Sequence, residues 1–147
     1  MISYEIRNGI LYNTNSSEDQ RNIIIPQDVE LIWFDAFNSC KEIEHISLNE
    51  KLRCIKGGVF LECTKLKSIY IPRSVVKIHV FTDEYIENCK LANSKGGFSE
   101  FRNSPHDFKV IGCKGSFAEK YCTHFEIPFE TIDDKTLWFH RIRIVPR

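Results

Sequence analysis

The chain has 147 residues, of which 42% are hydrophobic and 27% are charged, and its twenty basic residues balance twenty acidic ones. A chain of this length can bury a core in one domain, and it lacks the basic excess that draws proteins to nucleic acid or anionic membranes. No segment approaches the roughly 20 apolar residues that a membrane-spanning helix needs, so we predict one globular domain with no nucleic-acid partner and no membrane span.

The N-terminal residues predict a β-hairpin. Asn8 and Gly9 form the residue pair that two-residue hairpin turns favour. Apolar residues alternate with polar ones on both sides of this pair, at Tyr4, Ile6, Ile10 and Tyr12. We assign residues 1–22 to an N-terminal cap, in which a polar loop leads into the first repeat.

The start of the chain and its cysteines bear on the compartment. As given, the chain has no basic region followed by a long apolar run, so we expect no export signal and a cytoplasmic protein. If a leader stood upstream of Met1, the protein would instead be secreted or on the cell surface. The six cysteines include no C-x-x-C pair. Their even number permits three disulfides, but free thiols are expected in a reducing compartment.

A repeat of 23 residues begins at residue 23, and eight apolar positions recur in type one unit later. The first unit has Ile23, Ile25, Val29, Ile32, Ala36, Phe37, Cys40 and Ile43; the second has Ile46, Leu48, Leu52, Ile55, Val59, Phe60, Cys63 and Leu66. A third copy opens with Ile69, Ile71, Val75 and Ile78. Because one unit cannot bury these residues alone, the period predicts units that stack into a solenoid.

Each unit is predicted to hold a short strand, a second apolar pair and a return segment. In the second unit Ile46 and Leu48 alternate with Ser47, which is the pattern of a strand with one buried face. The pair Leu52 and Ile55 precedes a turn, after which apolar residues at near-helical offsets bring the chain back on the opposite side.

The repeat register is lost after Ile78. Strict counting would place Thr82 and Asp83 at the Ala and Phe positions of the next unit. An insertion of three residues would restore the pattern, with the Ala, Phe and Cys positions held by Tyr85, Ile86 and Cys89. Residues 91–107 are rich in Gly, Ser and Asn, which predicts an irregular loop.

Residues 108–147 are predicted to form a C-terminal cap and an edge strand. Ser116 and Glu119 make the S-x-x-E pattern that caps a helix N-terminus. One face of the short helix that follows carries Phe117, Ala118, Tyr121, Cys122 and Phe125. Near the end of the chain, Ile142 and Ile144 alternate with Arg141 and Arg143, as in an edge strand whose charges oppose aggregation.

The units resemble the leucine-rich repeats of the BspA-like type, which occur in bacterial and protist proteins. The resemblance is carried by "IIIPQDVELIWFDAFNSCKEIEH", "ISLNEKLRCIKGGVFLECTKLKS" and "IYIPRSVVKI". The helix and strand near the C-terminus resemble the usual end of such arrays, although Cys122 stands where alanine is usual. The resemblance implies one leucine-rich repeat solenoid domain over residues 1–147, an α/β fold of mostly short β-strands. Its repeats span 23–90, in about three rungs.

For exported members, the resemblance implies adhesion or surface recognition. We therefore expect a non-catalytic module that binds a protein ligand of unknown identity, without a cofactor. Cys40 and His45 have a spacing that could suit a metal site, but the next unit has Cys63 and Ser68 at these positions. A buried structural cysteine is therefore favoured over a metal ligand, and a disulfide between stacked rungs would need Cα atoms within about 7 Å.

Two alternatives to a binding module stay open. One is a thiol-dependent enzyme, for which Cys54 is the best candidate because its position in the unit places it near the surface. Cys113, which precedes the predicted helix, is a second candidate thiol. The other alternative is a purely structural scaffold unit.

The predicted binding surface is the outward face of the first strand of each unit. Ile24, Ser47 and Tyr70 point away from the core in successive units, flanked by Asn22, His45 and Ser68. Curved solenoids bind ligands on such a face. We predict that Ile24, His45, Ser47 and Tyr70 contact the ligand, with Ile24 and Tyr70 as anchors.

Overall fold

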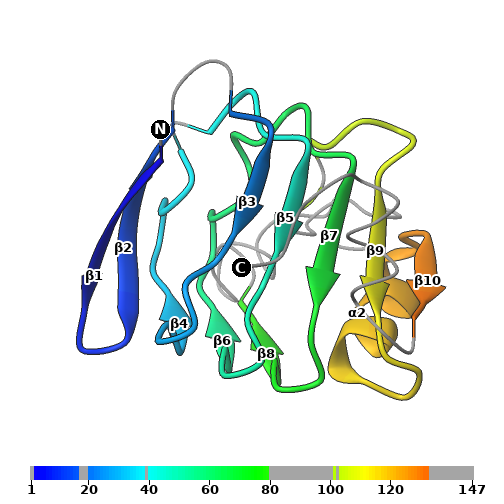
Figure 1. Cartoon of the computed structure of the whole chain (residues 1–147). Helices are drawn as coiled ribbons and strands as arrows, with labels where there is room; N and C mark the ends of the chain where they lie inside the picture. The colour runs from blue at the N-terminus through cyan, green and yellow to red at the C-terminus, as the bar shows by residue number, and fades with distance from the viewer. Residues whose placement is uncertain (1, 17–19, 39, 80–100, 102, 133–147) are drawn as a thin grey trace, which may run out of the picture.

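The computed structural model describes residues 2–16, 20–38, 40–79, 101 and 103–132, and within them two five-stranded sheets face each other (Figure 1). Sheet A has the order β1 (Ser3–Arg7), β2 (Ile10–Asn15), β4 (Leu31–Ile32), β6 (Cys54–Ile55) and β8 (Lys77–Ile78). Sheet B has the order β10 (Phe129–Thr131), β9 (Lys109–Gly112), β7 (Ser68–Ile71), β5 (His45–Ser47) and β3 (Asn22–Ile24). The chain alternates between the sheets and so forms the predicted solenoid.

The predicted N-terminal hairpin is confirmed. β1 and β2 pair antiparallel, and the turn residues Asn8 and Gly9 have φ angles of 52° and 77°, which both positions of a tight hairpin turn require. β2 also pairs in parallel with β4, where Leu11 lies opposite Ile32. The hairpin is therefore a rung of sheet A as well as a cap.

The hairpin and its loop also cover the edge of sheet B. β3 pairs with β5 on one side, and its Asn22 and Ile24 carbonyls face the other side. The Gln20 side chain donates a hydrogen bond to the Asn22 carbonyl (2.7 Å), and the Tyr4 hydroxyl donates one to the Ile24 carbonyl (3.3 Å). Both edge acceptors are thus satisfied within the chain and are not available to pair with another strand.

The core consists of side-chain ladders that cross the strands in register. In sheet A the ladder is Leu11, Ile32, Ile55 and Ile78; in sheet B it is Ile23, Ile46, Ile69 and Val110. All sixteen apolar positions matched between the first two units are buried. The 23-residue period therefore places each ladder residue directly above its counterpart in the next rung, as predicted.

The return segments are successions of tight turns rather than helices. Amide groups bond to carbonyls three residues earlier, as in Cys40 N to Phe37 O (3.0 Å) and Leu66 N to Cys63 O (3.2 Å). The thiols of Cys40 and Cys63 contribute by donating to the carbonyls of Thr14 (3.9 Å) and Phe37 (3.8 Å) in the preceding turn. Both cysteines are buried thiols that form no disulfide within the described part of the chain, which confirms the structural interpretation of this position.

The second unit has Asn49 where the first and third have proline. This buried side chain donates to the carbonyls of Pro26 (2.6 Å) and Val29 (2.9 Å), and accepts from the Lys51 amide (2.7 Å). Asn49 therefore joins the turn of its own rung to the turn of the preceding rung.

The solenoid has about four turns rather than three, because the hairpin adds a rung to sheet A and β9 adds one to sheet B. A stack of aromatic rings in the core marks the extension. Phe101 stacks on Phe60 with ring centroids 5.2 Å apart, and Phe60 stacks on Phe37 at 5.6 Å. The sequence pattern assigned this position to Ile86, which lies outside the described residues, and assigned Phe101 to the irregular loop 91–107. That loop therefore supplies a buried core residue.

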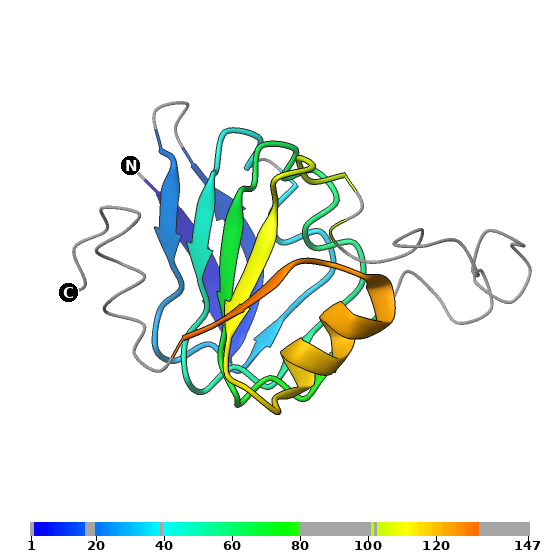
Figure 2. The ribbon, with the colours of Figure 1, turned by 90° about the vertical axis from the view of Figure 1, so that its right-hand side faces the viewer.

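The C-terminal cap forms as predicted over β9, α2 (Phe117–Phe125) and β10, and Figure 2 shows α2 and β10 in front of the stacked strands. The Glu119 amide donates to the Ser116 hydroxyl oxygen (3.3 Å), while the Glu119 carboxylate accepts from the Gly115 amide (2.9 Å). At Gly112 a Cβ atom would lie 3.0 Å from the Ile71 carbonyl oxygen and 3.1 Å from the Phe129 ring, so close packing favours glycine at this position. The predicted edge strand at 136–147 lies outside the described residues.

Candidate protein interface

The stripe predicted from the sequence lies on the outer face of sheet B. β5 pairs with β3 and β7 so that Ser47 lies opposite both Ile24 and Tyr70, and His45 lies opposite Asn22 and Ser68. Ile24 and His45 are half-buried, but Ser47 is only 1% exposed and Tyr70 only 5%. The four side chains are aligned as expected, although the two at the middle of the stripe are far less exposed than an open sheet face would leave them.

Tyr70 belongs to a second apolar cluster, separate from the main core, together with Ile111 and the half-buried Ile24 and Ile132. Its hydroxyl donates to a Glu50 carboxylate oxygen at 3.0 Å. Burial, reinforced by the negative charge of Glu50, raises the pKa of Tyr70 above its usual value. Tyr70 thus has a structural role on this face, and its predicted role as an interface anchor stays a prediction.

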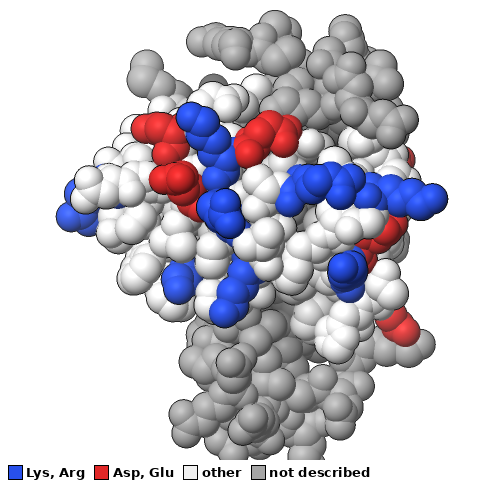
Figure 3. All heavy atoms as spheres, turned by 90° about the horizontal axis from the view of Figure 1, so that it is seen from below, with Lys and Arg blue, Asp and Glu red and all other residues white. Residues whose placement is uncertain are grey.

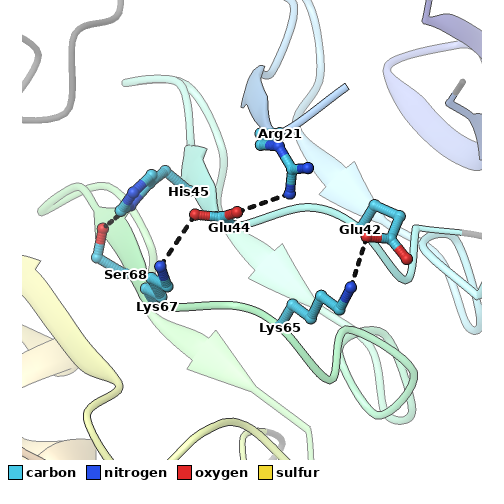
Figure 4. Close-up of polar contacts among 7 residues, drawn as sticks. All are labelled: Arg21, Glu42, Glu44, His45, Lys65, Lys67 and Ser68. Carbon is cyan, nitrogen blue, oxygen red and sulfur yellow. Dashed lines mark hydrogen bonds and ion pairs between the residues drawn. The ribbon is translucent and has the colours of Figure 1, made fainter. Parts of the chain in front are cut away.

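His45 is held by its neighbour in the next rung. Its Nδ1 atom lies 2.6 Å from the Ser68 hydroxyl oxygen (Figure 4). Burial lowers the pKa of His45, and the nearby charges of Lys67 and Lys109 lower it further, against the opposing charge of Glu44. His45 therefore favours its neutral form, in which it hydrogen bonds to Ser68.

Charged residues at the start of these strands form an ion-pair ladder with the same 23-residue spacing. Glu44 pairs with Arg21 of the preceding rung (2.8 Å) and with Lys67 of the next (3.2 Å), and Lys65 pairs with Glu42 (2.7 Å), as Figure 4 shows. Burial tends to raise the pKa of Glu44, but the hydrogen bonds and charges of Lys67 and Arg21 outweigh it and lower the pKa. The acidic and basic side chains of this ladder therefore largely compensate each other's charge.

The outer face of sheet A is different, because aromatic side chains lie exposed there. Trp33 is 37% exposed and Phe34 is 44% exposed, with ring centroids 5.2 Å apart. Tyr12, on the neighbouring strand β2, lies 5.8 Å from the Trp33 ring, and the Arg7 guanidinium lies 4.3 Å from the Tyr12 ring centroid. We call Tyr12, Trp33 and Phe34 the aromatic patch.

Basic side chains continue this face across β6 and β8. The Lys56 ammonium lies 5.8 Å from the Trp33 ring centroid. Lys77 lies opposite Cys54 on the next strand, and Cys54 in turn lies opposite Leu31. Among the described residues, neither lysine forms an ion pair. Figure 3 shows Lys and Arg side chains interspersed with Asp and Glu side chains over the adjoining end of the solenoid.

The sequence-based prediction did not include this surface, because it considered outward residues only on the first strand of each unit. A signal was present in "LIWF" at 31–34, where two further apolar residues follow Ile32. Since Ile32 is an inward ladder residue, alternation places Trp33 outward. Phe34 follows in the turn, where a polar residue would be usual.

The thiol of Cys54, the first candidate nucleophile, shows no activation. Burial raises the pKa of Cys54 although Lys56 and Lys77 oppose this, and burial raises the pKa of Cys122 to about 12. Cys113 is half-buried after β9, near the Tyr70 hydroxyl. Among the described residues no three His, Cys, Asp or Glu side chains group as metal ligands would, and no helix is long and apolar enough to cross a membrane.

A family model of the BspA-type leucine-rich repeat region matches residues 4–138 with six copies of the repeat. The chain belongs to the BspA-type leucine-rich repeat family. A search of curated proteins found no match for this leucine-rich repeat domain. Among solved structures, it is similar to a leucine-rich repeat protein from Bacteroides ovatus, with 17% sequence identity and a TM-score of 0.39. That alignment covers 89% of this chain and 39% of the Bacteroides protein.

Proposed function

We propose that this leucine-rich repeat domain is a non-catalytic protein-binding module that contacts its partner through outward side chains of successive rungs. The exposure of Trp33 and Phe34 carries the proposal. The repeat buries its apolar ladder positions, yet these two neighbouring aromatic side chains lie outside the core, beside Tyr12. Exposed aromatic clusters of this kind mark protein contacts, because aromatic residues supply much of the binding energy of interfaces.

The stripe on sheet B is a second proposed contact surface. Its accessible members are Ile24 and His45, since Ser47 and Tyr70 are almost fully buried. A partner on this face would contact the half-buried side chains first, whereas the aromatic patch on sheet A offers larger exposed rings. We therefore expect the aromatic patch to contribute more to affinity than the stripe.

The raised pKa of Cys54 argues against this thiol as a nucleophile, because a nucleophilic cysteine needs a lowered pKa. The two functions give different results with Cys54→Ser and Cys113→Ser. Under the binding function both variants retain partner capture. If the protein is a thiol-dependent enzyme, the wild type forms a covalent adduct with an electrophilic substrate analogue and one of the two variants does not.

The test is affinity capture with the immobilised full chain and surface variants. We expect Trp33→Ala combined with Phe34→Ala to lose most of the captured protein, and Ile24→Asp to lose less. His124→Ala is the matched control, because His124 is an exposed ring on α2 that belongs to neither surface. If the captured proteins are the same for wild type and for variants of both faces, the proposed function is wrong and a purely structural scaffold is favoured.

A further inference from the structure

We propose that the partner segment bound on sheet A is an extended acidic peptide, whose apolar side chains contact the aromatic patch and whose carboxylates reach Lys56 and Lys77. The inference rests on the proposed function and adds the chemistry and the direction of the partner. It follows from the way in which the outer face of sheet A changes from strand to strand.

The N-terminal side of this face is apolar. The aromatic patch spans β2 and the residues that follow β4, with centroid distances of 5.8 Å and 5.2 Å between successive rings. Beside it runs a second outward row in which Ile10 lies opposite Leu31, and both are half-buried. The two rows form one apolar surface, which fits hydrophobic side chains of a partner.

The C-terminal side of the face is cationic. Lys56 lies one strand beyond Trp33 and Lys77 one strand beyond Cys54, and the charges of both lysines act on the Cys54 thiol. Neither lysine has an ion-pair partner within the described part of the chain. The cation at the opposite margin, Arg7, already pairs with Glu5 at 3.3 Å. Among the described residues, Lys56 after β6 and Lys77 on β8 therefore place positive charge without an ion pair beyond the apolar surface.

This arrangement sets a direction for the partner. Neighbouring strands lie about 4.8 Å apart, so the Lys77 strand is roughly 10 Å from the strand that precedes Trp33. An extended chain rises about 3.3 Å per residue and crosses this distance in about three residues. The fitting segment runs across the strands, with its acidic residues about three positions away from its apolar ones.

Charge favours a peptide over a nucleic acid as the occupant. Single-stranded nucleic acids bind to grooves in which many basic residues follow the phosphates, whereas this face has two unpaired lysines on a chain of zero net charge. The ion-pair ladder at the start of the sheet B strands is a weaker site for an acidic partner, because its cations already form ion pairs with Glu44 and Glu42.

The probe is a synthetic peptide in which a Phe-Leu pair is separated from a Glu-Glu pair by one serine, titrated into the isotope-labelled full chain and followed by NMR. We expect amide shifts on β4, β6 and β8. Lys56→Glu with Lys77→Glu should weaken binding by about tenfold or more, since two attractions become repulsions. The matched control is Lys114→Glu with Lys120→Glu, an exposed lysine before α2 and one within it, with the same change in net charge, for which binding should stay within about twofold.

Several outcomes overturn the inference. They are the absence of measurable binding, shifts confined to sheet B, equal weakening by the control pair, and equal binding of the peptide with lysine in place of glutamate. Tighter binding of oligothymidylate than of the acidic peptide would identify a nucleic-acid surface instead. The inference can fail while the proposed function stands: if a captured protein needs Trp33 but tolerates the charge reversal, protein binding is supported and the acidic partner is excluded.

Discussion

The outer faces of the two sheets come from the same 23-residue unit but differ in how their side chains are engaged. On sheet B the outward side chains bond to one another across rungs, as His45 does with Ser68, and Tyr70 with Glu50 of the turn region. On sheet A the outward rings of Trp33 and Phe34 are exposed, and Lys56 and Lys77 have no ion pair among the described residues. The repeat therefore determines the inward ladder, while outward positions can either support the stack or remain available to a partner.

The largest expected effect is the difference in the free energy of unfolding between loss of an inward ring and loss of an outward ring. Phe60 is fully buried between Phe37 and Phe101, so Phe60→Ala leaves a cavity and should lower the free energy of unfolding by about 3–5 kcal/mol. Trp33→Ala removes a larger but exposed ring and should cost about 1 kcal/mol or less. Urea denaturation of both variants measures the difference. Equal costs would mean that the aromatic patch is part of the folded core.

The next effect concerns the turn between the two sheets. Asn49→Ala leaves the Pro26 and Val29 carbonyls without their side-chain donor, and should cost about 2–3 kcal/mol. Asn13→Ala is the control, because Asn13 is exposed on β2. Thermal denaturation of the two variants measures the difference in stability. A cost for Asn49→Ala no larger than the control's would show that water replaces the lost donor and that Asn49 does not hold the turns of the two rungs together.

Two tyrosines allow a direct comparison of the outer faces. Tyr70→Phe removes the hydroxyl that donates to Glu50 and should cost about 1–2 kcal/mol, because hydrogen bonds to charged groups are strong when partly buried. Tyr12→Phe, on sheet A, should change stability by less than about 0.5 kcal/mol. Urea midpoints of the two variants test whether only sheet B uses its outward hydroxyl for stability. The reverse order would contradict the assignment of the two faces.

The smallest effect depends on pH. Because burial lowers the pKa of His45 in the folded state, the unfolded chain binds a proton more readily as the pH falls below about 6.5. The contribution of His45 to stability is therefore present above that pH and is lost as the pH falls toward the folded-state pKa. We expect the stability difference between wild type and His45→Gln to shrink between about pH 7.5 and about pH 5.5. A difference that grows over this range would contradict the lowered pKa.

The repeat itself was predictable to a large extent, because exact spacing is a strong signal. All sixteen matched ladder residues are buried, the Asn8-Gly9 hairpin forms, and Ser116 caps α2. The burial of Cys40 and Cys63 also followed from their recurrence, since a metal pair would have had to recur as well. Each of these features depends on residues close in sequence or separated by one constant period.

Other features needed contacts that no period specifies. Phe101 completes the aromatic stack although 41 residues separate it from Phe60, and the rung formed by β9 lies beyond a long interruption of the pattern. The burial of Tyr70 depends on Ile111 and Ile132 of the C-terminal cap. Alternation alone could place Tyr70 outward, but could not show that other side chains cover it.

By itself the sequence determined the stacking direction, the inward ladders and the family, because apolar burial at constant spacing leaves few other solutions. The tertiary structure decided the number of turns and which outward face is occupied by the protein's own side chains. The reason is physical: an inward residue meets its own counterpart in the next rung, whereas an outward residue meets whatever segment the fold brings beside it. The aromatic patch and the two lysines of sheet A became a candidate surface only when their neighbours were known.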